Sequence, residues 1–196
     1  MGRAHAALGS HWPEYLIEAA GLGAFMIVAG ICVMLLNAPG TIRAVASPDI
    51  RRGVVGIAMG LTAIAIIYSP WGMRSGAHLN PAVTLSFLRL GKMAPADAAF
   101  YVLAQFAGGA AGAVALAALF GERFTLPPIS AIATLPGSRG EAAAFCAEAV
   151  IAFILMTTVL AANASLWLMR WTGVFAGSLV ALYIAVEAPR RRCARG

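Results

Sequence analysis

A small set of polar side chains in this chain could do chemistry, and each lies in or beside an apolar segment. Glu18 and Glu148 are acids early in long apolar runs, while His78 and Asn80 lie in the stretch SGAHLNPAVTL, residues 75–85. Acids and a histidine could relay protons, but an enzyme also needs a nucleophile beside its base. We find no such nucleophile. Asn80 offers a different chemistry, because its side-chain amide can donate hydrogen bonds to a passing oxygen.

The composition places these residues in a membrane protein. The chain has 196 residues, of which 61% are hydrophobic and 11% charged, and its mean hydropathy is +0.83, well above that of soluble domains. The net charge is +6, but the arginines at 190–192 adjoin an apolar run, which is typical of lipid head-group contacts. We therefore expect a lipid bilayer as partner and no nucleic acid.

The spacing of Cys32, Cys146 and Cys193 is not that of a disulfide framework. We therefore interpret these cysteines as packing residues and expect neither metal nor cofactor.

Five segments are long enough to cross a bilayer, which takes about 20 apolar residues in a helix. The predicted fold class is therefore an all-α membrane protein with five transmembrane helices. One further apolar segment, residues 80–90, is too short to cross. The five predicted spans are residues 15–37, 53–70, 98–120, 141–163 and 171–189.

The short segment has the features of a half-helix that enters the membrane and stops. Eleven residues make a helix about 16 Å long, roughly half the hydrocarbon thickness. Asn80 is a favoured N-cap residue and Pro81 suits the first helical position, while Gly76 allows a tight turn before them. The helix N-terminus carries a partial positive charge, which favours a neutral oxygen and repels cations. The alternative is that Asn80 only caps the helix.

Small residues recur four positions apart on three predicted spans. In lipid, such pairs let two helix backbones approach closely, so they predict a tight bundle. The two halves of the chain also share a layout, because each begins with an acid early in an apolar helix. That layout is typical of the inverted repeats of membrane transport proteins. The pairs are Gly56 with Gly60, Gly108 with Gly112, and Gly173 with Gly177.

These features resemble the aquaporin or major intrinsic protein family of water and small-solute channels. The likeness extends over about residues 14–189 and rests on SGAHLNPAVTL after the second span, on Glu18 and Glu148, and on Gln105 with the glycines that follow it. The family fold has six spans and two re-entrant half-helices. The resemblance therefore implies an incomplete aquaporin-like transmembrane domain over residues 1–189, with five spans and one half-helix.

The resemblance also implies a role for individual residues. It implies no catalytic residue, no cofactor and passive transport of water or small uncharged solutes such as glycerol, by a homotetramer in the cell membrane. For the two acids it implies support of the re-entrant loops, with proton relay as the alternative. The implied sites are the pore motif Asn80, Pro81 and Ala82; loop support by Gly76, His78, Glu18 and Glu148; helix packing by Gln105, Gly108 and Gly112; and a constriction formed by Met59 or Gly60 with Tyr183 or Ile184.

The sequence departs from the family pattern at its carboxyl end. The family has a second Asn-Pro-Ala loop after the fifth span, followed by an arginine at the narrowest point, whereas residues 190–196 read RRRCARG. We expect this basic tail to be aberrant, the product of a frameshift or truncated reading frame. The alternative function is that of a non-conducting membrane subunit with a structural or interaction role.

Overall fold

The computed structural model describes residues 2–37, 47–133 and 140–187, and within these ranges the chain is helical and contains no strand. This confirms the predicted all-α membrane fold class. Residues 188 and 189 of the predicted fifth span and the tail at 190–196 lie outside the described residues. Among the described residues, five helices are long and apolar enough to span a membrane: Ala7–Asn37, Pro48–Tyr68, Pro95–Phe120, Gly140–Asn163 and Met169–Val186.

The helices follow one another with short connections. In chain order the elements are α1 (Gly2–Asn37), α2 (Pro48–Tyr68), α3 (Pro70–Ser75), α4 (Pro81–Arg89), α5 (Pro95–Phe120), α6 (Glu122–Thr125), the 3-10 turn η2 (Ser130–Ile132), α7 (Gly140–Asn163), the 3-10 turn η3 (Met169–Trp171) and α8 (Thr172–Glu187).

Serine caps and prolines move the limits of the second span from those predicted. The helix α2 begins five residues earlier than expected because the Ser47 hydroxyl accepts a hydrogen bond from the Ile50 backbone N–H, with Pro48 in the first turn. It ends before Pro70 because Ser69 caps a new helix, accepting from the Gly72 N–H at 2.9 Å. Proline suits the first turn of a helix because its missing N–H would have no partner there.

The first helix is longer than the predicted span and is kinked near its start. It extends back to Gly2 instead of beginning at residue 15, and His11 has non-helical angles of φ −122° and ψ 15°. Pro13 lies just after the kink, and a proline inside a helix removes one backbone hydrogen bond and crowds the preceding turn. The helical residues before His11 therefore precede the predicted span and are separated from it by the kink.

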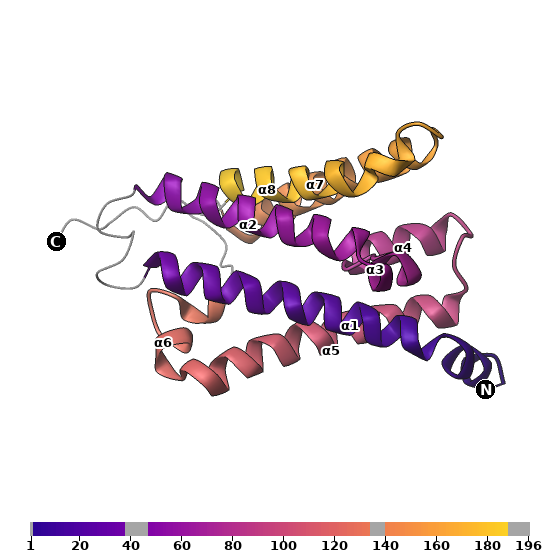
Figure 1. Ribbon diagram of the computed structural model, residues 1–196, viewed down its shortest axis with the longest axis horizontal. Coiled ribbons are helices and arrows are strands. Elements are labelled where there is room, and N and C mark those ends of the chain that lie inside the picture. The colour runs from indigo at the N-terminus through magenta and orange to yellow at the C-terminus, as the bar shows by residue number, and fades with distance from the viewer. Residues whose placement is uncertain (1, 38–46, 134–139, 188–196) are drawn as a thin grey trace.

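Glycines bring the spans together in two pairs, α1 with α5 and α2 with α8 (Figure 1). A methyl group on the Gly112 α-carbon would lie 2.6 Å from the Gly23 carbonyl oxygen of α1. A methyl group on Gly60 would lie 2.5 Å from the Gly177 carbonyl oxygen of α8. Since any side chain there would separate the helices, the four-residue spacing of glycines has the packing consequence that the sequence predicted.

The helices α3 and α4 lie in the half of the bundle nearer the amino terminus (Figure 1). The helix α2 ends at Tyr68, α3 makes a short excursion, and α4 leads back towards the end of the bundle at which α5 begins. The helix α4 has nine residues and packs against α5 and α7. The chain between α3 and α4, residues 76–80, is half-buried apart from the exposed Gly76.

Candidate functional site

The loop at residues 76–80 makes its turn through an unusual run of backbone conformations. Gly76 has φ +84° and closes α3, with its N–H donating to the Gly72 carbonyl oxygen at 2.9 Å. Ala77 and Leu79 also have positive φ, at 43° and 48°. Non-glycine residues rarely adopt this region, which costs about 1–2 kcal/mol per residue, so neighbouring groups must hold the loop.

The buried carboxylate of Glu18 holds this loop from α1. Its side chain is 0% exposed. Oε1 accepts hydrogen bonds from the Ser75 hydroxyl at 2.8 Å and the His78 backbone N–H at 3.0 Å. Oε2 accepts from the Leu79 backbone N–H and the Gln105 Nε2 amino group, both at 2.8 Å. Four donors match the acceptor capacity of an ionised carboxylate, so the loop, α3 and α5 all converge on one side chain.

A second layer of hydrogen bonds surrounds that carboxylate. The buried Thr84 hydroxyl of α4 accepts from Gln105 Nε2 at 3.1 Å and lies 3.1 Å from His78 Nδ1. The Tyr101 hydroxyl of α5 donates to the Ser75 carbonyl oxygen at 2.8 Å. The network therefore ties the half-helix to α5 as well as to α1.

Sequence reasoning missed Ser75, Thr84 and Tyr101 as members of this network. Two of them lay inside the stretch SGAHLNPAVTL, where a serine and a threonine in an apolar setting were the available signal. Gln105 was predicted only to pack helices, and the structure adds its two hydrogen bonds. The His78 ring stacks on Phe87 with centroids 4.9 Å apart and lies 5.2 Å from the Tyr101 ring.

Asn80 and Pro81 form the start of α4. The Asn80 Oδ1 atom accepts a hydrogen bond from the Ala82 backbone N–H at 2.8 Å, and Pro81 lies in the first turn. The Asn80 carbonyl oxygen accepts from the Thr84 N–H at 3.1 Å. The Nδ2 amino group has no hydrogen bond to any residue in the described part of the chain. The Oδ1 atom of this amide thus caps the helix, while the two N–H groups of Nδ2 can still donate hydrogen bonds.

Glu148 does not join the cluster around Glu18. Its side chain is exposed on α7, and it makes no hydrogen bond or ion pair within residues 2–37, 47–133 and 140–187. Its role in supporting a loop stays a prediction.

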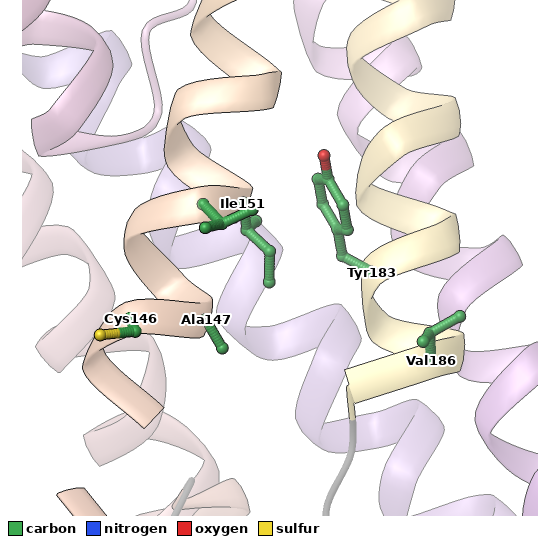
Figure 2. A pocket seen from close by; sticks show the side chains of 6 residues that line it. Cys146, Ala147, Ile151, Tyr183 and Val186 are labelled. Atoms are coloured by element: carbon green, nitrogen blue, oxygen red, sulfur yellow. The ribbon is translucent and has the colours of Figure 1, made fainter. Parts of the chain in front are cut away.

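The predicted constriction residues lie in different surroundings. Met59 is 1% exposed on α2, and Gly60 is packed against the α8 backbone. Ile184 of α8 is half-buried. Tyr183 lies between α7 and α8 (Figure 2) and borders an open, apolar depression of about 440 Å³. None of the Asn-Pro-Ala residues lines that depression. Whether these residues narrow a pore stays a prediction.

The chain is similar to known channel proteins. Residues 9–191 match the family model for the major intrinsic protein family. Aquaporin NIP1-4 of Oryza sativa subsp. japonica is 38% identical over 69% of this chain and 48% of its own length. Aquaglyceroporin AqpS of Rhizobium meliloti is 37% identical over 74% and 56%, and Aquaporin NIP1-2 of Arabidopsis thaliana is 31% identical over 84% and 55%.

The chain spans about half the length of these curated relatives. The family model nonetheless covers nearly all of its residues, including every span, the loop and the half-helix. With its five apolar helices it is a multi-pass membrane protein. This chain belongs to the major intrinsic protein family.

Proposed function

We propose that this chain forms the wall of a passive channel for water and small uncharged solutes such as glycerol. One observation carries the proposal. At the half-buried start of a half-helix, the Asn80 Oδ1 atom caps the helix, while the Nδ2 amino group makes no hydrogen bond within the described residues and can donate to another partner. A fixed donor beside the positive end of a helix suits the oxygen of a neutral solute.

The transport step is an exchange of hydrogen bonds and needs no covalent chemistry. A water or hydroxyl oxygen accepts from Asn80 Nδ2, then leaves as the next molecule in file replaces it. The partial positive charge at the α4 N-terminus repels hydronium and metal cations at the same point. Pro81 and Ala82 complete the first turn that directs this charge.

The loop residues have a supporting role in this proposal. Glu18 fixes the position of Asn80 through the two backbone N–H groups that precede it, while Gly76 makes the turn and the His78 ring packs it. By the repeat of the chain, Glu148 is proposed to support a loop in the same way. Met59, Gly60, Tyr183 and Ile184 are proposed to set the width of the path.

Glycerol is included because one relative carries the name aquaglyceroporin. We propose as the working assembly the homotetramer that the family resemblance implies, and many large apolar side chains of the described residues are exposed in one chain. Both lipid and neighbouring copies would cover such surfaces.

Stopped-flow light scattering tests the proposal. The full chain of 196 residues is reconstituted into phosphatidylcholine vesicles, which are then exposed to an osmotic step made with sucrose or with glycerol. A channel gives faster shrinkage than protein-free vesicles with a low activation energy, and rapid re-swelling in glycerol if that solute passes. Shrinkage at the lipid rate, from vesicles that contain the folded helical protein, would overturn it.

A second candidate is a non-conducting membrane subunit. It is favoured by the exposure of α7, whose buried residues in the described structure are limited to Met156 and Ala162, and by the exposed Glu148. If this candidate is right, one chain does not form a complete channel wall on the side where α7 lies. Lipid-like permeability of the reconstituted protein supports this candidate over the channel.

A further inference from the structure

All four tryptophans of the chain are exposed, and all lie on segments in the same half of the bundle. Trp12 lies near the start of α1, Trp71 in α3, and Trp167 and Trp171 in the connection between α7 and α8. These segments lie in the half of the molecule that carries the amino terminus (Figure 1). The four side chains are between 45% and 73% exposed. Tryptophan concentrates at the level of lipid head groups, so this end has the character of a membrane interface.

The connection between α7 and α8 is an ordered structure at that level. The helix α7 has 24 residues and is about 36 Å long, which exceeds the roughly 30 Å of hydrocarbon. Its connection to α8 therefore reaches the head-group layer. Backbone hydrogen bonds fold it into turns, such as Met169 N–H to the Ser165 carbonyl at 2.9 Å and Trp171 N–H to the Leu168 carbonyl at 2.8 Å.

Arg170 is held between the two tryptophans of this connection. Its Cζ atom lies 5.4 Å from the Trp167 ring centroid and 5.9 Å from the Trp171 ring centroid, distances suited to cation–π attraction. Its carbonyl oxygen accepts a hydrogen bond from the Tyr68 hydroxyl at 2.6 Å, which anchors the connection to the end of α2. The rings attract the face of the guanidinium and leave its N–H edges able to bind an acceptor.

The positive charge at this end has little acidic compensation. No acidic side chain in the described ranges forms an ion pair with Arg170, Arg89 or Lys92, and all three are exposed. Arg74 pairs with Glu14 at 2.9 Å. A planar guanidinium matches the oxygens of a phosphate, and the adjoining exposed Leu166 and Trp167 suit the boundary with acyl chains.

We propose that the connection between α7 and α8 binds the phosphate of an anionic phospholipid, with Arg170 as its ligand and with Trp167 and Trp171 as the interfacial walls. The inference does not depend on conduction, because it concerns the outer surface of the bundle. A surface arginine near an anionic leaflet enriches such lipid by a factor of about five.

Tryptophan quenching by brominated lipid tests the site in the full chain. Trp12 and Trp71 are replaced by phenylalanine, so that Trp167 and Trp171 report alone. The protein is reconstituted in phosphatidylcholine with the same minor fraction of acyl-brominated phosphatidylglycerol or phosphatidylcholine. We expect clearly stronger quenching by the brominated phosphatidylglycerol. Equal quenching by the two lipids would overturn the proposal.

Two matched variants locate the effect. Arg170→Gln removes the excess quenching, whereas Arg123→Gln, an exposed arginine on α6 at the other end of the bundle, retains it. Circular dichroism checks that both keep their helices. An excess that survives Arg170→Gln, or disappears equally in Arg123→Gln, contradicts the assignment.

Adding salt or inorganic phosphate to the protein with Arg170 intact provides a further test of the site. Raising the salt concentration reduces the excess because it screens the charges, and an excess insensitive to salt would count against a phosphate ligand. Inorganic phosphate at constant ionic strength leaves the excess unchanged if the ligand is the lipid. If free phosphate abolishes the excess, the site binds phosphate in solution and the lipid assignment is wrong.

Discussion

The backbone N–H of Leu79 donates a hydrogen bond to Oε2 of Glu18 at 2.8 Å, across 61 residues of sequence. The bond joins the residue just before the N-cap of the half-helix to the middle part of α1. Because three other donors meet the same carboxylate, this side chain connects the first span, the loop and α5.

Replacing Glu18 by glutamine is expected to destabilise the protein by about 2–4 kcal/mol, since buried donors left unpaired cost about 1–3 kcal/mol each. The amide keeps one acceptor oxygen, but its NH₂ group faces donors that the carboxylate had satisfied. Thermal unfolding of the purified protein in detergent measures the change.

The matched control is Glu148→Gln, at an exposed position without a described hydrogen bond. It should shift stability by about 0.5 kcal/mol or less, as other surface changes do. Equal losses in the two variants would mean that the hydrogen bonds of Glu18 do not hold the loop.

Substitutions of Asn80 separate its two tasks. Asn80→Asp keeps an oxygen to accept from the Ala82 N–H but loses the Nδ2 donor, so the fold stays stable and the proposed water flux falls towards that of protein-free vesicles. Asn80→Ala loses both and also costs about 1 kcal/mol of stability as a lost N-cap. Melting curves and stopped-flow rates are measured on the same preparations. Wild-type flux in Asn80→Asp would remove Asn80 from the proposed transport path.

Neighbouring glycines of α5 should respond oppositely to alanine. A methyl group on Gly108 would overlap the Ala19 backbone of α1, whereas on Gly109 its nearest neighbour is a Leu22 methyl group at 3.6 Å. Gly108→Ala should therefore cost about 1–3 kcal/mol through forced separation of the helices. Gly109→Ala should be neutral or slightly stabilising because alanine favours the helix. Thermal unfolding decides between them, and equal effects would contradict the close approach of α1 and α5.

Thr84→Val tests the second layer of the network. Valine has the same shape but leaves the Gln105 amino group and the His78 ring nitrogen without the hydroxyl that lies 3.1 Å from each, at an expected cost of about 2 kcal/mol. Thr84→Ser keeps the hydroxyl and loses one methyl group, worth about 1 kcal/mol. Serine should therefore melt at the higher temperature. The reverse order would show that packing, not hydrogen bonding, dominates at this position.

Local signals allowed much of the fold to be predicted. Apolar runs of sufficient length gave the five spans, and the Asn80-Pro81 pair gave the start of the half-helix, because capping depends on a few adjacent residues. The limits were less accurate where a cap lay outside the apolar run. Ser47 and Ser69 set the ends of α2 through hydrogen bonds that average hydropathy does not register.

The network around Glu18 was only partly predictable. The stretch SGAHLNPAVTL and an acid in the first span indicated that a loop would be held, but not which oxygen receives which donor. Tyr101 gave no signal, since an aromatic residue in an apolar helix is ordinarily a packing residue. The positions of Tyr101 and Gln105 on one face of α5, opposite Ser75 and Thr84, follow from how α5 packs on α1 and α4.

The sequence by itself determined that the chain enters a membrane, that it has five apolar segments long enough to cross, and that Asn80 starts a half-length helix. Hydrophobicity and capping are properties of short segments, so they can be read without the fold. Only the tertiary structure decided that Glu18 meets four donors while Glu148 remains exposed, although both acids lie in similar apolar helices. Burial and hydrogen bonding depend on which helices become neighbours, and residues far apart in the chain set that arrangement.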